Sequence, residues 1–446
     1  MSRRGQAPTA RAVAAQVLTR VERDQAFASA SLDTELERAV QLVPADRRLT
    51  TELVYGVLRC ERYLDRRIAK HARKGVESLD AEVRVHLRVA VYQIVILERI
   101  PAFAAVSAAV DLVRVARGPH VARFANAVLR KIATEAEQHG RVPMSEAVKS
   151  SLDPRLVQRV SAALGGREHA EAMLSAGPFP PALGLRIHAG QDVDTWMHTL
   201  ESAVPGARLT RGKVSPRCLS LLGAGRPDDL PGFEVAWSVQ EEGSQVLGAA
   251  LRAMPGERVL DACAGRGNKT LLLAEQVGPE GCVDAADLHE PKLEALHARA
   301  RALGLPVRHT FPVDWTVGTG DVPDHYDRVL VDAPCSGIGT MRRRPEVAHR
   351  DLDRTLPALH SLQSGILAHA ATRCRPGGRI VYAVCSVLRN EAEDVIESVL
   401  SRGVPLEPVP FDDDHAIELI RGKTTMRLLP HEHGTDGYFL ASFRKV

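Results

Sequence analysis

The chain lacks both the paired cysteines of a zinc or disulfide scaffold and any apolar run long enough to cross a membrane. Its seven cysteines are spread singly, with no C-x-x-C pair and no histidine at ligand spacing beside them, so the sequence indicates no bound metal. Residues 1–6 carry positive charge, but no apolar segment follows them, so they do not form a secretory signal. We therefore expect a cytoplasmic globular protein, a monomer, whose thiols are either catalytic or inert.

The chain also has little excess charge of either sign. Its 58 basic and 55 acidic residues give a net charge of +3, so binding to nucleic acid would have to come from local basic patches. One basic row follows a predicted helix and its end, at Arg59, Arg62, Arg66, Arg67, Lys70, Arg73 and Lys74. Such a row is either a solvated helix face or an RNA contact, and the sequence leaves both interpretations open.

Glycine is scarce in the first 140 residues, where apolar residues recur every three or four positions. This spacing predicts an all-helical domain over 1–140, with helices near 10–21, 45–73, 79–98, 104–116 and 121–134. Between 141 and 232 proline and glycine are frequent, as at 177–181 and 223–227, which indicates a linker and a small α+β subdomain. From 233 to 446 strand and helix patterns alternate, as in a doubly wound α/β sheet.

The segment 123–130, Arg-Phe-Ala-Asn-Ala-Val-Leu-Arg, resembles the closing helix of the NusB-like RNA-binding domain of antitermination factors. The helices predicted ahead of it follow in the order that this family requires. The resemblance covers the first 140 residues and implies a helical module that docks RNA or protein.

A glycine-containing loop follows the first strand pattern of the carboxy-terminal region. The strand 258–263 leads into the loop 264–269, and a helix begins near Thr270. Such a loop lets a ligand approach the backbone closely, with the amides of the helix start facing it. Asp287 ends the next strand, where a carboxylate is placed to bind ribose hydroxyls, and Asp314 follows the strand-like 307–313. The pattern G-x-x-x-x-G-K-S/T is absent, so the residues predict a nucleoside cofactor other than ATP, either a dinucleotide or S-adenosylmethionine.

Two further strand patterns each end in a cysteine. The pattern 326–331 runs into Asp332 and Cys335, and 380–384 runs into Cys385. A lone cysteine at a strand end is commonly a small core residue. The carboxyl ends of strands in an open α/β sheet, however, meet at one rim where ligands bind. Two thiols and a carboxylate at that rim indicate half of an active site.

Five separated motifs resemble those of the Nol/Nop/Sun family of RNA cytosine-5 methyltransferases: residues 239–245, 261–270, 332–345, 382–387 and 434–440. With the helical domain ahead of them, their order is similar to that of family members acting on bacterial 16S ribosomal RNA. The resemblance implies a Rossmann-like class I methyltransferase domain with a seven-stranded sheet. It also implies S-adenosylmethionine bound by Cys263, Ala264, Gly265, Arg266, Gly267, Asn268, Lys269, Asp287, Asp314 and Asp332.

The chemistry of cytosine agrees with this resemblance. Carbon 5 is a poor nucleophile that an enzyme activates by adding a thiolate to carbon 6, and Cys385 matches the family's nucleophile. Asp332 is placed to hydrogen bond ring nitrogen N3 and so to stabilise the adduct. Cys335 resembles the second cysteine that the family uses for product release.

Some positions depart from the family or carry separate expectations. Arg266 and Asn268 replace a usual proline and glycine, and asparagine suits the second position because it tolerates positive φ. The basic run 342–344 is expected to contact RNA phosphates beside a pocket for a flipped base. The motif 431–433, His-Glu-His, has metal-like spacing but no third ligand nearby in sequence, which favours a solvated loop.

Three other functions compete with this one. A non-enzymatic RNA-binding or antitermination adaptor would leave the two thiols without a role. An amino-methyltransferase would offer an Asn/Asp-Pro-Pro-aromatic turn, where this chain has Asp332-Ala333-Pro334-Cys335. A DNA cytosine methyltransferase would leave the motif at Cys385 unexplained. The expected partner is therefore RNA, as 16S ribosomal RNA or a small-subunit precursor.

Overall fold

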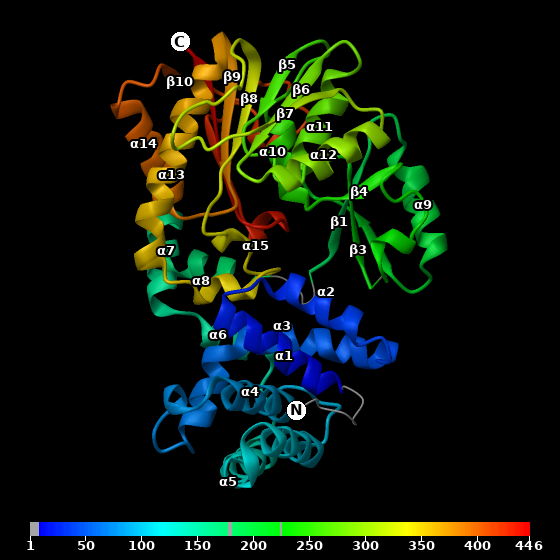
Figure 1. Cartoon of the computed structure of the whole chain (residues 1–446), viewed down its shortest axis with the longest axis vertical. Coiled ribbons are helices and arrows are strands. Elements are labelled where there is room, and N and C mark those ends of the chain that lie inside the picture. The colour runs from blue at the N-terminus through cyan, green and yellow to red at the C-terminus, as the bar shows by residue number, and fades with distance from the viewer. Residues whose placement is uncertain (1–8, 177–180, 224) are drawn as a thin grey trace. The chain divides into compact units, whose positions relative to one another are not determined.

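The computed structural model describes residues 9–176, 181–223 and 225–446 (Figure 1). The charged start at 1–6 lies outside the described residues, as do positions 177–180 and 224 of the two segments rich in proline and glycine. The chain forms two compact units, residues 1–157 with 344–349 and residues 158–343 with 350–446. Among the described residues, no helix combines the length and apolarity needed to span a membrane.

The described part of the first unit is helical, as the spacing of its apolar residues predicts. Asp80 caps one helix by accepting a hydrogen bond from Glu82 N at 2.9 Å, and Gly118, with φ of 83°, breaks the longest helix into two arms. These arms correspond to the two helices predicted over 104–116 and 121–134. The helices are α1 (Ala10–Asp24), α2 (Ala28–Arg38), α3 (Pro44–Ala69), α4 (Ala81–Val95), α5 (Ala102–His139) and α6 (Met144–Ser151), with 3-10 turns at Val76–Ser78 and Pro345–His349.

The basic row on α3 is largely used inside this unit. Four of its side chains have partners there: Arg62 with Asp153, Arg66 with the carbonyl of Ser150, and Arg67 and Lys70 with Glu135. Cations that are already paired contribute little to binding an external polyanion. These four contacts therefore favour a structural role for that part of the row.

The second unit begins within α7 and contains a small antiparallel sheet. The helices α7 (Pro154–Leu164) and α8 (Arg167–Leu174) lie where the sequence indicated a linker. The sheet has the order β2-β3-β1-β4, and Leu185, Leu219 and Trp237 lie in the core on one of its faces. Its elements are β1 (Leu183–Ile187), α9 (Val193–Ala203), β2 (Arg208–Arg211), β3 (Cys218–Leu222), a 3-10 turn (Pro227–Asp229) and β4 (Trp237–Val239).

The large sheet of this unit confirms the predicted methyltransferase architecture. Seven strands follow the order β10-β12-β9-β8-β5-β6-β7, and β11 pairs with β12 as an eighth strand beyond the seven expected. Strands β7, β6, β5, β8 and β9 are parallel to one another, whereas β12 is antiparallel to β9, β10 and β11. The strands are β5 (Arg258–Asp261), β6 (Cys282–Asp287), β7 (Val307–Pro312), β8 (Tyr326–Asp332), β9 (Cys374–Val384), β10 (Leu406–Pro408), β11 (Thr425–Leu428) and β12 (Tyr438–Lys445).

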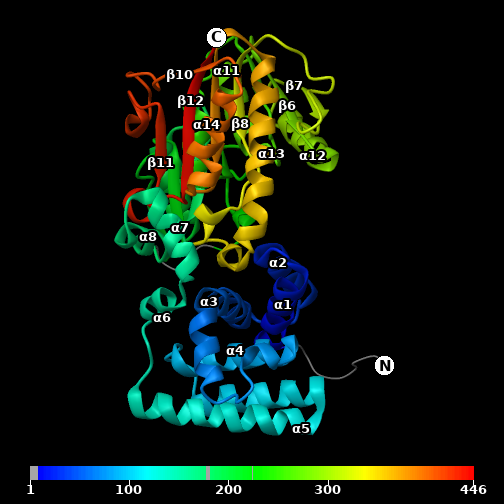
Figure 2. The ribbon, with the colours of Figure 1, turned by 90° about the vertical axis from the view of Figure 1, so that its left-hand side faces the viewer.

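Helices cover both faces of this sheet, and Figure 2 looks onto the face that α13 and α14 cover. Val331 and Tyr382 face the layer with α13 and α14, while Leu330 and Val381 face the layer with α10, α11 and α12, because side chains alternate along a strand. The helices are α10 (Glu242–Ala250), α11 (Asn268–Val277), α12 (Glu290–Ala302), α13 (Leu352–Arg373), α14 (Glu393–Ser401) and α15 (Pro430–His433), with 3-10 turns at Ile338–Thr340, Arg389–Glu391 and Glu418–Ile420. The register pairs Asp332 with Ala383, so the carboxyl ends of β8 and β9 lie side by side.

Candidate active site

The loop between β5 and α11 is held by its own backbone and by Asp287. Gly265 and Gly267 have φ values of 55° and 87°, which glycine adopts without steric cost. Gly265 N donates to Asp287 Oδ2 at 2.9 Å, and His289 N donates to the other oxygen of the same carboxylate at 2.9 Å. The end of β6 and the loop after β5 are thereby fixed against each other.

A cavity of about 330 Å³ opens beside this loop. Four of the predicted cofactor-binding residues, Cys263, Asp287, Asp314 and Asp332, line it. Its wall also contains residues that the sequence did not single out, namely Ala262, Leu288, His289, Lys292, Val313, Trp315, Pro334, Leu362 and Ile366. The combination of an apolar wall with a few oriented carboxylates is typical of a pocket for a nucleoside.

Asp314 is oriented by a local turn. Its Oδ1 accepts from Thr316 N at 2.9 Å and from Thr316 Oγ1 at 2.6 Å, and these two bonds lower the pKa of the carboxyl group. The neighbouring Trp315 donates its indole N–H to the carbonyl of Ala262 at 2.7 Å. An ionised carboxylate and a fixed aromatic ring therefore stand together at the cavity.

The two thiols predicted to share one rim are in contact. Cys335 Sγ and Cys385 Sγ lie 3.1 Å apart, and both side chains are half-buried. The hydrogen bond to Cys385, together with burial, raises the pKa of Cys335 well above its ordinary value. The two sulfur atoms thus share one hydrogen bond, in which either thiol can be the donor.

Asp332, at the end of β8, is paired with a lysine from the cofactor loop. Lys269 Nζ lies 2.6 Å from Asp332 Oδ2. Burial by itself would lower the pKa of Lys269, but the charges of Asp332, Asp261 and Cys385 raise it above its ordinary value. The ammonium group therefore stays charged in a buried site, where it interacts with both the carboxylate and the thiol of Cys385.

A buried glutamate that the sequence did not reveal orders both cysteine loops. Glu391 is fully buried and accepts from Ser336 N at 2.7 Å, from Ser336 Oγ at 2.5 Å and from Gln363 Nε2 at 3.1 Å. Its own carbonyl accepts from the hydroxyl of Tyr382 at 2.7 Å. The residue after Cys335 and the strand before Cys385 are thus bound to the same short turn.

Main-chain bonds join a third segment to these loops. Gly339 N donates to the carbonyl of Cys385 at 3.1 Å, and Gly437 N donates to the carbonyl of Gly339 at 2.7 Å. A Cβ atom on Gly339 would lie 1.8 Å from the carbonyl oxygen of Gly437, so only glycine fits there. The start of β12 is therefore attached to the cysteine pair.

Comparisons with known proteins agree with this geometry. A family model described as 16S rRNA methyltransferase RsmB/F matches residues 248–444, and the NusB family model matches residues 8–134. The chain is 30% identical, over 98% of its length, to the whole of a probable ribosomal RNA small subunit methyltransferase B from Synechocystis. It is 34% identical, over 97% of its length, to 99% of the ribosomal RNA small subunit methyltransferase B from Xylella fastidiosa.

The chain belongs to the RsmB/F methyltransferase family. The crystal structure of PH0851 has the same fold, with a TM-score of 0.80 over 99% of this chain and 100% of that chain, at 24% identity. As a member of this family, the chain is an rRNA methyltransferase that depends on S-adenosylmethionine. The cavity fits that cofactor, because it has a nucleoside-sized volume and two carboxylates at the ends of β6 and β7.

The remaining predicted cofactor residues support the loop rather than line the cavity. Among the described residues, Ala264, Gly265, Arg266, Gly267, Asn268 and Lys269 are not part of its wall. Asn268 does not have the positive φ that the sequence argument assumed, because Gly267 takes that conformation instead. The amide of Asn268 donates to the carbonyl of Val239 at 3.3 Å and accepts from Arg299 at 2.8 Å.

The basic run 342–344 is engaged inside the protein, which corrects the expectation of free phosphate contacts. Arg342 is 9% exposed and pairs with Glu241 and Asp436. Arg343 pairs with Asp436 at 3.2 Å, and Arg344 lies over the ring of Phe27 in the first unit. The sequence could not show this, because Glu241 and Asp436 are about a hundred residues away on either side.

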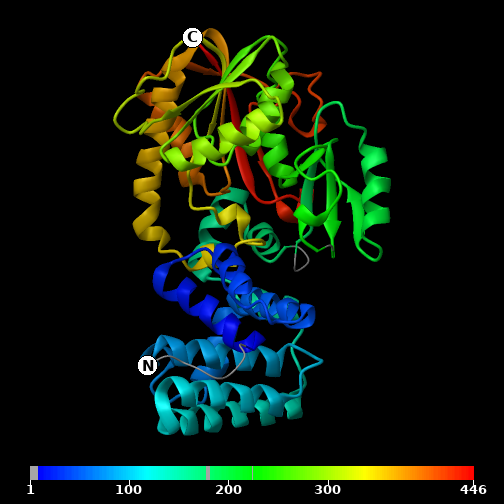
Figure 3. The same cartoon turned by 45° about the vertical axis from the view of Figure 1, so that its right-hand side comes forward.

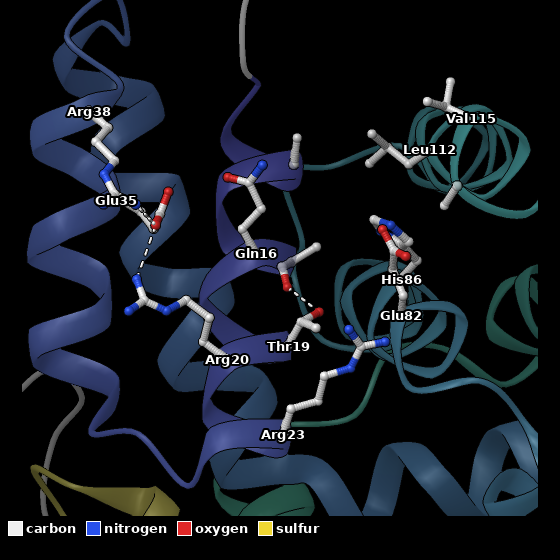
Figure 4. Close-up of a pocket in the computed structure, with 13 residues that line it drawn as sticks. Gln16, Thr19, Arg20, Arg23, Glu35, Arg38, Glu82, His86, Leu112 and Val115 are labelled. Atoms are coloured by element: carbon white, nitrogen blue, oxygen red, sulfur yellow. Dashed lines mark hydrogen bonds and ion pairs between the residues drawn. The ribbon is translucent and has the colours of Figure 1, made fainter. Parts of the chain in front are cut away.

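Two further groupings lie outside this site. A cavity of about 430 Å³ in the first unit is lined by α1, α2, α4 and α5, and its Arg20 and Arg38 both pair with Glu35 (Figure 4). In the second unit, His169 joins His431 and Glu432, with their ligating atoms within 4.8 Å of one another. A third potential ligand for the His-Glu-His motif therefore exists in space, although it is distant in sequence.

Proposed function

We propose that the chain methylates carbon 5 of a cytidine in 16S rRNA through a covalent adduct between Cys385 and carbon 6. The observation that carries the proposal is the contact between Cys335 and Cys385 beside Asp332, at the rim of the cofactor cavity. The names of the relatives, which are small-subunit rRNA methyltransferases, support this class of RNA.

In the first step, the thiolate of Cys385 adds to carbon 6 of the base. The buried ammonium of Lys269 stabilises negative charge at this position, and Cys335 Sγ lies within hydrogen-bond distance of Cys385 Sγ. Addition breaks the C5–C6 double bond and moves its electron pair onto the C5–C4–N3 system.

Asp332 stabilises that electron pair at N3. The proton lost by the Cys385 thiol passes to N3. One oxygen of Asp332 is bound to Lys269, and the other can accept a hydrogen bond from the resulting N3–H. S-adenosylmethionine supplies the methyl group when bound, and Asp287 and Asp314 would hold its nucleoside. Carbon 5 then carries both a methyl group and its original proton.

In the last step, that proton leaves carbon 5, the C5–C6 double bond re-forms and the bond to Cys385 breaks. Cys335 is the polar group next to the departing sulfur: it passes its S–H proton to that sulfur and takes the C5 proton in exchange, and N3 then releases its proton to solvent. Overall, one proton is exchanged for one methyl group, and no oxidant or reductant is needed.

The test incubates the purified protein with labelled S-adenosylmethionine and unmodified 16S rRNA, followed by bisulfite sequencing. We expect one protected cytidine. A label on the exocyclic nitrogen of a base, or no label, would contradict the proposal, and the second outcome would favour the adaptor.

Two cysteine variants separate the roles. Cys385→Ala should abolish both methylation and the covalent complex, because alanine offers no nucleophile. Cys335→Ala should still form the adduct and transfer the methyl group, so RNA should remain attached to the protein on a denaturing gel. If only Cys385→Ala traps RNA, the two roles are reversed. If neither variant loses activity, the thiols are structural.

A further inference from the structure

The open face of the small sheet forms the floor of a second cavity in the same unit, of about 300 Å³. The register places Thr210 opposite Ser220 and Ser220 opposite Gly184, so one row of small or polar residues crosses three strands. The other face of the sheet carries the apolar core, with α9 against it, and Figure 3 shows the green sheet between α9 and the red end of the chain. We name this cavity the β2–β3 pocket.

The β2–β3 pocket contains two cations with no internal partner. In the part of the chain that the structure describes, the side chains of Arg208 and Lys213 make no hydrogen bond or ion pair, and both residues are exposed. Arg208 begins β2 and Lys213 follows its end, and Thr210, which lies between them in the chain, and its strand partner Ser220 also line the wall. Such an arrangement offers both charge and hydrogen-bond donors to one ligand.

The carboxylates in the wall are already satisfied. Glu242 Oε1 accepts from Val214 N at 2.5 Å and from Ser215 N at 2.9 Å. Glu241 accepts from Ser244 N at 3.0 Å and pairs with Arg342. Four cations but only these two glutamates line the pocket, so the charge left uncompensated in it is positive.

The pocket is connected to the cysteine pair by a short stretch of backbone. Gly434 lines the pocket, and three residues later Gly437 donates to the carbonyl of Gly339, which in turn donates to the carbonyl of Cys385. Phosphates that neighbour a base held at the cysteine pair can therefore reach this pocket along a short path.

We propose that the β2–β3 pocket binds two backbone phosphates of the substrate RNA near the target nucleotide, one through Arg208 and one through Lys213. The inference rests on the proposed function for the identity of the RNA. The pocket wall contains no aromatic side chain among the described residues, so base stacking is not its mode of binding, whereas cations and hydroxyls suit a phosphate.

The test compares the full-length protein with the double variant Arg208→Gln/Lys213→Gln, using fluorescence anisotropy with a 16S rRNA fragment and no cofactor. Loss of two phosphate contacts to single-stranded RNA should reduce the slope of log affinity against log salt by about 1.4. Between 50 and 200 mM salt, the wild type should then lose about sevenfold more affinity than the variant. With cofactor, KM for RNA should rise while kcat and the affinity for S-adenosylmethionine stay unchanged.

The matched control is Arg211→Gln, since Arg211 lies on the same strand but pairs with Asp194 on α9. It should bind RNA as the wild type does. An unchanged salt slope in the double variant overturns the inference. An equal reduction of the slope in the control also overturns it, because the effect would then come from the overall positive charge of the protein. Because binding is measured without chemistry, a wild-type protein that binds RNA but methylates another atom would refute the proposed function alone.

Discussion

Asp261, the last residue of β5, provides the sharpest test of the electrostatics at the cofactor loop. It is 1% exposed, and its Oδ2 accepts from Thr270 Oγ1 at 2.7 Å. Its Oδ1 has no hydrogen-bond partner among the described residues. Burial raises the pKa of Asp261 to about 6, although the bond from Thr270 and the charge of Lys269 oppose the shift. Asp261→Asn removes the charge and keeps the shape.

The size of the effect follows from this pKa. The rise from the unfolded value of 3.8 to about 6 is roughly 2 units, which corresponds to about 3 kcal/mol. Because the pKa is raised by folding, the stabilising contribution of the protonated group is complete below pH 3.8 and is lost as the pH rises through 6. At pH 7.5 the asparagine variant should therefore be more stable than the wild type by up to about 3 kcal/mol, and the gain should fall to about half by pH 5.

The measurement is urea unfolding of both proteins between pH 5 and 8. The control is Asp284→Asn, because Asp284 is equally buried but accepts from Tyr326 at 2.7 Å and from His309 N at 3.1 Å. That variant loses charge-assisted bonds and should be destabilised. The reasoning is refuted if Asp261→Asn is no more stable than the wild type at pH 7.5. It is also refuted if the free energy of unfolding of the variant depends on pH as that of the wild type does, because burial would then not raise the pKa of Asp261.

Two further variants test the cofactor pocket and the cysteine loops. Asp287→Ala should weaken binding of S-adenosylmethionine about tenfold or more, since a charged acceptor is lost, while RNA affinity changes little; calorimetry that shows unchanged cofactor affinity would count against this pocket. Glu391→Gln should lower the free energy of unfolding by about 1–2 kcal/mol, because its bonds to Ser336 are weakened. It should also reduce kcat more than it changes KM for RNA or for S-adenosylmethionine, because the substrate contacts remain. Equal losses in kcat and in the folded fraction would make the role of Glu391 purely structural.

The sequence predicted the parallel strands and the rim of the site well. The patterns at 326–331 and 380–384 identified β8 and β9, and parallel pairing of Asp332 with Ala383 then brings Cys335 and Cys385 together. The strands follow from local hydrophobic periodicity, and the meeting of the two cysteines follows from the general topology of parallel sheets. Both can therefore be predicted from the sequence.

Features that depend on partners distant in sequence were missed. Arg342 reads as a phosphate ligand in a basic run, but in the fold it meets Asp436 and Glu241. Glu391 belongs to none of the motifs that the sequence offered, and only the fold shows it buried and bound to Ser336. The helices α7 and α8 were also missed, because frequent glycine and proline nearby suggested a linker. Burial and pairing of this kind are set by tertiary packing.

The two main-chain hydrogen bonds that join Cys385, Gly339 and Gly437 determine which positions near the thiol pair can change during sequence divergence. Every residue has a main-chain carbonyl group, and every residue except proline has a main-chain N–H. These bonds therefore do not depend on the identity of the surrounding side chains. These bonds do require that Gly339 has no side chain, because the carbonyl oxygen of Gly437 leaves no space for one. Side chains around the thiol pair can therefore be substituted without changing the main-chain bonds that position it. The exception is Gly339, where even the methyl group of alanine would collide with the carbonyl of Gly437.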